Sequence, residues 1–175
     1  MRAIDVRDLL GHPGSSRTAL LHEPIEGLAT ELASVPDDRP IDGELLLQGV
    51  AEGILTSGRL TGTMALRCAR CLKEFVRPFR VDVPGELFTV DPGPDSDDYP
   101  LGLEGELDPE QLVRDFVGLE LPFSPLCRPG CLGLCSVCGG DRNLGECQGH
   151  ETADPRWQML QGLFEDEDED DRRAR

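Results

Sequence analysis

The feature that most constrains this chain is a dense set of metal-ligating residues between Cys127 and His150. The stretch holds most of the seven cysteines, in the spacing C-x3-C-x3-C-x2-C-x8-C-x2-H. The other two, Cys68 and Cys71, form a C-x2-C of their own far upstream. Thiolates are soft ligands, and a C-x2-C turn directs two of them at one tetrahedral Zn2+. The chain is therefore expected to fold around bound metal.

Two divisions of these ligands are open. In the first, a local site of three cysteines and a histidine accompanies an all-thiolate site that joins the distant C-x2-C to a C-x3-C. The local site would comprise Cys135, Cys138, Cys147 and His150, and the all-thiolate site Cys68, Cys71, Cys127 and Cys131. In the second, one metal is bound by Cys68, Cys71, Cys135 and Cys138, and the remaining cysteines are free.

Disulfides and redox chemistry are the alternatives to metal. Disulfides need an oxidising compartment, yet the N-terminus lacks the apolar run of about 7–15 residues of a secretory signal. No stretch approaches the roughly 20 apolar residues of a membrane span. These observations favour a cytoplasmic, metal-bound protein. A redox role for Cys68-Ala-Arg-Cys71 expects a βαβ setting, whereas the flanks here indicate strands.

Alternating apolar residues predict an antiparallel β-meander between Ile41 and Val83. Its first strand is expected to end at the turn signal Thr56-Ser57-Gly58. Leu45 and Leu47 alternate with their neighbours in the first strand, which Ile54 and Leu55 close. The residues expected on one face are Leu60, Met64 and Leu66 in the second strand, and Phe75, Phe79, Val81 and Val83 in the third. This arrangement places Cys68-Ala-Arg-Cys71 at a hairpin tip, where both sulfurs can point outward to a metal.

Two helices are predicted in the C-terminal half. For the first, Asp108 is the expected cap, Pro109 the first helical residue and Gln111 the partner in a capping box. It should end at Pro122, with Leu112, Val113, Phe116 and Leu119 facing the core. The second helix should begin at Asp154-Pro155 and bury Trp157, Leu160, Leu163 and Phe164.

The predicted fold class is α+β. It combines an antiparallel β-meander core, two C-terminal helices and a cysteine cluster that resembles a zinc knuckle or zinc ribbon. A single domain is expected over residues 1–164, with N-terminal strands in 1–40, the β core in 41–90, an acidic loop in 91–107, and the helix and cysteine cluster in 108–164. The run of acids after residue 164 predicts a disordered tail over 165–175. His12 and His22 are expected on the surface.

The composition is strongly acidic, with a net charge of −17. Such a body disfavours indiscriminate binding to phosphate backbones and fits a basic partner, as ribosomal proteins are. One basic cluster surrounds the predicted hairpin tip, and its members are Arg67, Arg70, Lys73, Arg77 and Arg80. Cations and aromatic rings on one surface suit single-stranded nucleic acid, so these are candidate RNA-binding residues. Phe75 and Phe79 either stack on bases or belong to the core.

The order of these motifs resembles the YceD family, the large ribosomal RNA subunit accumulation proteins. The resemblance spans roughly residues 40–164. It is carried by Gly58-Arg59-Leu60, Cys68-Ala-Arg-Cys71-Leu72, Leu121-Pro-Phe-Ser-Pro-Leu-Cys127, Cys131-Leu-Gly-Leu-Cys135-Ser-Val-Cys138-Gly139 and Asp154-Pro155-Arg156-Trp157. The family's long form ends its cysteine cluster in C-x-C, whereas Cys147 here is followed by Gln148 and Gly149, with His150 as the next candidate ligand.

The resemblance implies a role in the accumulation or processing of 23S ribosomal RNA, and hence in large-subunit assembly. The leading hypothesis is a non-catalytic ribosome-biogenesis factor with one or two structural Zn2+ ions. Its partners would be precursor 23S rRNA, a basic large-subunit ribosomal protein, or both, with no membrane and no small-molecule substrate. One alternative is a C-x-x-C redox or zinc-dependent enzyme, although the chain lacks H-E-x-x-H. A protein-only adaptor or a transcription-linked zinc module is the other.

Overall fold

A computed structural model describes residues 1–147, 149 and 150. The chain divides into two compact units, Met1–Cys131 and Leu132–Arg175. The helix predicted from Asp154, with Trp157, Leu160, Leu163 and Phe164, and the predicted acidic tail over 165–175 lie outside the described residues. The single domain expected over 1–164 stays a prediction.

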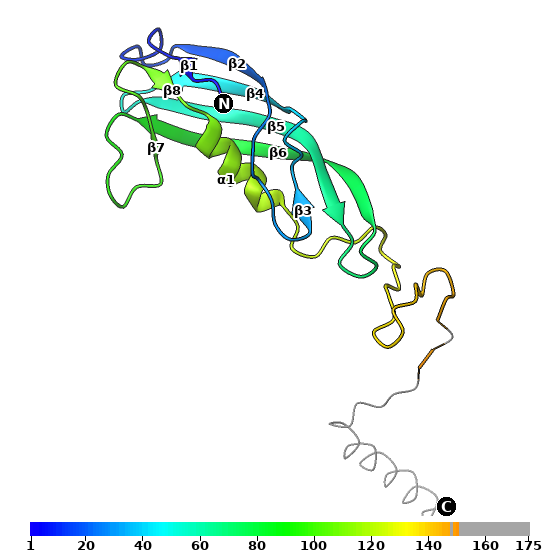
Figure 1. The fold of residues 1–175 in the computed structure, drawn as a ribbon. Coiled ribbons are helices and arrows are strands. Elements are labelled where there is room, and N and C mark those ends of the chain that lie inside the picture. Colours follow the sequence, from blue (N-terminus) through cyan, green and yellow to red (C-terminus); the bar gives the residue numbers. More distant parts are fainter. Residues whose placement is uncertain (148, 151–175) are drawn as a thin grey trace, which may run out of the picture. The chain divides into compact units, whose positions relative to one another are not determined.

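A six-stranded sheet dominates the first unit (Figure 1). Its strands follow the order β2-β4-β5-β6-β7, and β3 pairs with β5. All pairs are antiparallel except β6 with β7, and a separate two-stranded sheet pairs β1 with β8. The bounds are β1 Ile4–Asp5, β2 Ser16–Glu23, β3 Ala33–Ser34, β4 Ile41–Gly49, β5 Ile54–Arg67, β6 Glu74–Thr89, β7 Tyr99–Pro100 and β8 Glu106–Leu107. The predicted antiparallel meander is therefore present as β4-β5-β6.

Strict alternation in β4 explains why the sheet has one buried face. Leu45 and Leu47 are completely buried, and Leu46 between them is exposed. Successive side chains of a strand point to opposite faces, so this pattern fixes which side of β4 packs against the core. The prediction for these two leucines is confirmed.

The turn predicted at Thr56-Ser57-Gly58 is wrong, because β5 runs through these residues without a break. The β4–β5 turn lies earlier, where Val50 N–H donates to the Gly53 carbonyl at 3.0 Å. Between Thr56 and Gly58 the register with β6 shifts, which marks a β-bulge. Gly58 has φ +155, and a Cβ there would lie 2.1 Å from the Glu44 carbonyl oxygen. This glycine allows the neighbouring strand to approach closely and does not end the strand.

The β5–β6 hairpin extends to the pair Arg67 and Glu74, so Cys68-Ala-Arg-Cys71 lies at its tip as predicted. Phe79 packs its ring over Gly62 of the facing strand, since a Cβ on this glycine would lie 2.6 Å from the ring. Phe79 is buried, as are Val81 and Val83. The structure thus assigns Phe79 to the hydrophobic core.

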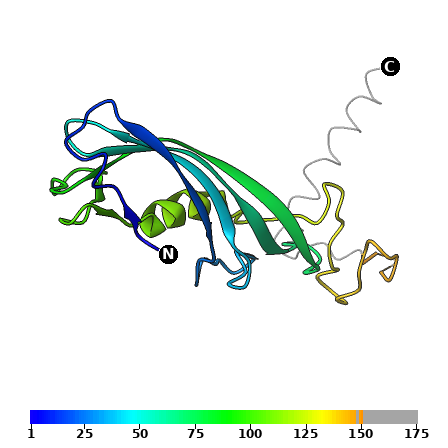
Figure 2. The same cartoon turned by 90° about the horizontal axis from the view of Figure 1, so that it is seen from above.

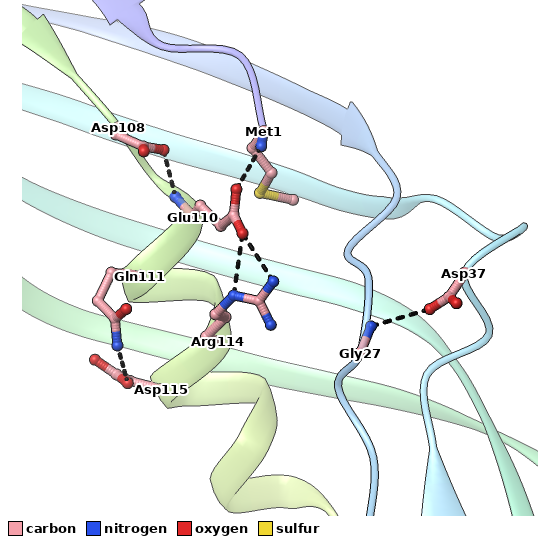
Figure 3. A network of polar contacts seen from close by, with 8 residues as sticks. All are labelled: Met1, Gly27, Asp37, Asp108, Glu110, Gln111, Arg114 and Asp115. Carbon is pink, nitrogen blue, oxygen red and sulfur yellow. Dashed lines mark hydrogen bonds and ion pairs between the residues drawn. The ribbon is translucent and has the colours of Figure 1, made fainter.

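The helix α1, Glu110–Glu120, lies against one face of the sheet (Figures 1 and 2). It begins one residue later than predicted, with Pro109 at the cap position. Asp108 Oδ1 still accepts a hydrogen bond from the Glu110 backbone N–H at 2.9 Å (Figure 3). The predicted capping box is wrong, because the Gln111 side chain donates forward to Asp115 at 2.8 Å. Glu120 is the last helical residue, as expected from Pro122.

The buried face of α1 is formed by Leu112, Val113 and Val117. Phe116 packs partly against the core, as predicted. Leu119 was expected in the core, but 86% of it is exposed. Leu119 lies seven residues after the buried Leu112 and only about 20° around the helix from it, so helical spacing does not explain its exposure.

Two histidines in the N-terminal part of the chain were predicted to lie on the surface. His12 and His22 are both exposed, as expected. His22 Nδ1 lies 2.6 Å from a carboxylate oxygen of Asp42 on the neighbouring strand. Among the described residues, no helix is both long and apolar enough to cross a membrane.

Candidate metal centres

The first centre comprises Cys68, Cys71, Cys127 and Cys131, all within the first unit. The hairpin tip supplies the first pair, and the chain that follows α1 supplies the second. All four sulfur atoms lie within 4.8 Å of one another. The Sγ atoms of Cys71 and Cys127 are 3.7 Å apart, and those of Cys68 and Cys131 are 3.8 Å apart.

These separations match a tetrahedral zinc site. With Zn–S bonds of about 2.3 Å, the sulfurs of a regular tetrahedron lie about 3.8 Å apart. The described cysteines are free thiols, and the observed separations far exceed a disulfide bond of about 2.05 Å. The donor set is therefore suited to one four-coordinate soft metal ion.

Three hydrogen bonds fix the ligand-bearing segment to the hairpin. Ala69 N–H donates to the Pro125 carbonyl at 2.8 Å. Arg70 Nη1 donates to the Cys131 carbonyl at 2.8 Å, and Arg77 Nη2 donates to the Leu126 carbonyl at 3.2 Å. Two members of the predicted basic cluster thus position the second pair of cysteines. Sequence reasoning missed this role, because it depends on contacts between distant segments.

The four thiols differ in their acidity. Burial of Cys68 opposes ionisation, but hydrogen bonds from the backbone N–H groups of Cys127, Cys71 and Arg70 lower its pKa to about 6. Burial raises the pKa of Cys127 to about 12, and the neighbouring thiols of Cys71 and Cys131 add to the shift. Several thiolates so close together repel one another, so their joint ionisation requires a bound cation.

The second centre comprises Cys135, Cys138, Cys147 and His150, all in the second unit. Their ligand atoms also lie within 4.8 Å of one another. The Sγ atom of Cys135 accepts a hydrogen bond from Val137 N–H at 3.4 Å. Hydrogen bonds from the backbone N–H groups of Cys138 and Val137 lower the pKa of Cys135 to about 6. Three thiolates and an imidazole form a common structural zinc set.

The same backbone frame recurs in both centres. In the first, Leu72 N–H donates to the Cys68 carbonyl, and Cys68 N–H donates to the Lys73 carbonyl, both at 2.9 Å. In the second, Gly139 N–H donates to the Cys135 carbonyl, and Cys135 N–H to the Gly140 carbonyl, again both at 2.9 Å. The two C-x2-C motifs therefore form the same type of knuckle.

The second unit has little apolar burial of its own. Within its described part, the large apolar side chains are all exposed, namely Leu132, Leu134, Val137 and Leu144. Hydrophobic burial is the main favourable contribution to folding in most domains. This segment lacks that contribution, and its grouped cysteines and His150 are the feature that could replace it.

The structure groups the ligands as in the predicted two-site division. Cys68 and Cys71 lie with Cys127 and Cys131, whereas Cys135 and Cys138 lie with Cys147 and His150. The mixed set of the single-site alternative is not a group that the structure brings together among the described residues. Metal occupancy itself stays a prediction.

Only some members of the predicted basic cluster lie at the hairpin tip. Arg67 forms an ion pair with Glu74 at 3.3 Å, and Arg77 lies over the half-buried ring of Phe75, 5.5 Å from its centroid. Arg80 is opposite Thr61, well along the hairpin from the tip. The side chains of Lys73 and Arg80 have no hydrogen-bond or ion-pair partner within the described part of the chain.

Phe123, four residues before Cys127, is an exposed aromatic residue that sequence reasoning did not single out. Of this residue, 89% is accessible to solvent. Its position between Pro122 and Pro125 could have drawn attention to this residue in the sequence, because the two prolines restrict the backbone that carries the ring.

Comparison with known proteins agrees with these motifs. Residues 56–164 match the family model described as "Large ribosomal RNA subunit accumulation protein YceD". The match includes both knuckles and more than half of the chain.

The chain belongs to the YceD family.

Relatives of this YceD protein include actinobacterial and plant sequences. An uncharacterised protein of Mycobacterium tuberculosis is 33% identical over 165 residues, which cover 90% of this chain and 78% of the relative. A Mycobacterium leprae protein is 30% identical over 168 residues, covering 91% and 76% respectively. The Arabidopsis thaliana "Large ribosomal RNA subunit accumulation protein YCED homolog 1, chloroplastic" is 34% identical over 61 residues. These cover 34% of this chain and 19% of the plant protein. No solved structure matches the chain.

Proposed function

We propose that this YceD protein is a cytoplasmic, non-catalytic factor that supports the accumulation of 23S rRNA during large-subunit assembly. Membership of the family supports a role connected with large-subunit ribosomal RNA. The printed name of the plant relative supports the same role. The acidic composition, with a net charge of −17, suits contact with a basic ribosomal protein.

The observation that carries the mechanism is the tetrahedral spacing of the first centre, with Sγ separations of 3.7 and 3.8 Å. Cys68, Cys71, Cys127 and Cys131 would hold one Zn2+, and Cys135, Cys138, Cys147 and His150 a second. A bound Zn2+ would coordinate these ligands and so link the segments that carry them. A four-coordinate site of this kind leaves no position for a reacting water, so the centres would be structural.

The hairpin tip is the proposed contact for RNA. Arg70 and Arg77 donate hydrogen bonds to the segment that carries Cys127 and Cys131, and Lys73 follows Cys71 by two residues, while the chain as a whole is strongly acidic. A zinc ion with four thiolates carries a net charge of about −2, which these cations would more than offset. Phosphate groups would therefore be attracted to this tip and repelled by the acidic remainder of the molecule.

The redox alternative has one observation in its favour, the lowered pKa of Cys68. A reactive cysteine must also be reachable by its oxidant or partner thiol. Cys68 is completely buried, and its sulfur lies within the group of four. The structural role is therefore the better supported of the two.

The proposal is tested by depleting the protein in its host and measuring the ratio of 23S to 16S rRNA. Depletion should lower the ratio, and the wild-type gene should restore it. Charge reversal at Lys73, whose side chain has no partner within the described part of the chain, should weaken the restoration, whereas the exposed Arg39→Glu should restore the ratio fully. An unchanged ratio after complete depletion would refute the proposed function.

A further inference from the structure

Phe123 differs from the other described aromatic residues in its exposure. Phe79 and Phe88 are buried in the core, and Phe75, Phe116 and Tyr99 pack partly against it. Phe123, in contrast, is 89% exposed. A single exposed apolar residue is common on protein surfaces, so its meaning depends on what supports the ring and what surrounds it.

Two prolines flank Phe123, and hydrogen bonds hold the residues that follow it. Pro122 and Pro125 restrict the backbone of the segment. The Pro125 carbonyl accepts a hydrogen bond from Ala69 N–H at 2.8 Å, and the Leu126 carbonyl accepts one from Arg77 at 3.2 Å. A ring on such a segment loses little conformational entropy when it binds a partner, which is typical of an energetically important contact residue.

Cations adjoin the same segment. Arg77 is bonded to Leu126, and Arg70 and Lys73 belong to the turn that contains Ala69. A carbonyl acceptor does not neutralise a guanidinium, so Arg70 and Arg77 keep their full charge. No ion pair with a carboxylate forms at these three cations among the described residues.

We infer that Phe123 is a base-stacking residue for single-stranded RNA, whose phosphates contact Arg70, Lys73 and Arg77. This inference rests on the proposed function and names the RNA form that the hairpin tip accepts. In duplex RNA the bases are already stacked inside the helix, and a protruding ring has no free base face to contact. Unpaired nucleotides offer both the base faces and the flexible phosphates that this combination of ring and cations requires.

The test uses fluorescence anisotropy of the full-length, zinc-loaded protein with a labelled oligouridine and with a short RNA duplex. Phe123→Ala should weaken oligouridine binding roughly 5- to 100-fold, because stacking on one base is lost. Phe123→Trp should keep the affinity. Leu103→Ala is the matched control, since Leu103 is also 89% exposed and should leave binding unchanged.

Salt dependence separates the ring from the cations. Phe123→Ala removes no charge and should leave the slope of affinity against salt concentration unchanged. Lys73→Ala should reduce that slope by about one counterion. The duplex should bind more weakly than oligouridine, and Phe123→Ala should not change its affinity.

Two failures are distinguishable. If the wild-type protein binds neither RNA at low salt, the proposed RNA contact fails together with this inference. If the wild-type protein binds oligouridine and Phe123→Ala binds equally well, only the inference is wrong. A protein partner that co-purifies with the wild type even after ribonuclease treatment would be a direct protein contact. If Phe123→Ala lost this partner but kept its RNA affinity, the ring would belong to a protein contact and the inference would be overturned.

Discussion

Leu72 and Gly139 occupy equivalent positions in the two knuckles, each directly after the second cysteine. Both have left-handed backbones, with φ of 60° for Leu72 and 73° for Gly139. Each donates its N–H to the carbonyl of the first cysteine at 2.9 Å. Leu72 is the one non-glycine residue with positive φ in the described chain. The first centre therefore tolerates a strained residue where the second has glycine.

This relationship predicts unequal effects of substitution. Gly139→Leu should weaken metal binding at the second centre by about 1–2 kcal/mol, the cost of a left-handed side-chain-bearing residue. The cost reflects the backbone alone, because a Cβ at Gly139 would meet nothing within 4 Å. Leu72→Gly should leave metal affinity at the first centre the same or slightly higher. Competition with a chromophoric chelator measures both, and unchanged affinity in Gly139→Leu would contradict the prediction.

The two centres should bind metal independently. Native mass spectrometry should find two Zn2+ ions per chain, and one in either Cys71→Ser or Cys138→Ser. Cys71→Ser should lower the melting temperature of the sheet, because its centre joins the hairpin to residues 127–131. Cys138→Ser should leave that transition nearly unchanged and make residues 132–150 sensitive to protease. Loss of both metals in Cys138→Ser would show that the centres are coupled.

The contact between Gly62 and Phe79 predicts a steric effect in the sheet. Gly62→Ala would place its Cβ 2.6 Å from the Phe79 ring, so the ring must shift. We expect a loss of about 1–3 kcal/mol in the free energy of unfolding, measured by urea denaturation with zinc present. The control Gly118→Ala lies in α1 with its Cβ 3.7 Å from Leu28. It should stabilise the protein by about 0.5–1 kcal/mol, because alanine is the better helix former.

The ion pairs at the start of α1 predict a pH effect. The Met1 amino group lies 2.7 Å from Glu110, and Arg114 lies 2.8 Å from the same carboxylate (Figure 3). The hydrogen bond from Met1, followed by that from Arg114, holds the pKa of Glu110 below its ordinary value. A lowered carboxyl pKa stabilises the fold above the ordinary pKa of about 4.3, and this stability is lost as the pH falls through the folded-state pKa.

The comparison that measures this effect is wild type against Glu110→Gln. The wild type should have the higher melting temperature between pH 5 and 7, and the difference should shrink below about pH 4. Acid also releases metal from both proteins, so only their difference reports on Glu110. A difference that stays constant down to pH 3 would exclude the ion pair as its cause.

Local patterns were sufficient to predict much of this fold. The alternation around Leu45 and Leu47 predicted the buried face of β4, and the flanks of Cys68 and Cys71 predicted a hairpin tip. Cysteine spacing left two divisions of the ligands open, and the structure groups them as in one of these. The buried face of β4 and the hairpin tip were predictable because each depends on neighbours within a few residues.

Contacts between distant segments explain the failures. Gly58 was interpreted as a turn residue, but its role depends on the approach of Glu44 from the next strand. Leu119 lies on the same side of α1 as the buried Leu112, in the last turn of the helix, so its exposure did not follow from helical spacing. Arg70 and Arg77 were recognised in the sequence as members of a basic cluster. Their hydrogen bonds to the carbonyls of Cys131 and Leu126 are evident only in the folded chain.

The sequence separation of the ligands gives the two centres different places in the order of folding. Cys71 and Cys127 are 56 positions apart, so the first centre can close only after the intervening chain has brought them together. The second centre draws its ligands from one short stretch, so a metal ion bound there would not have to wait for the rest of the polypeptide to fold. A metal ion at the first centre would bind only after the tip of the β5–β6 hairpin and the segment that follows α1 have come together, and a chain truncated before Cys127 would not form this centre.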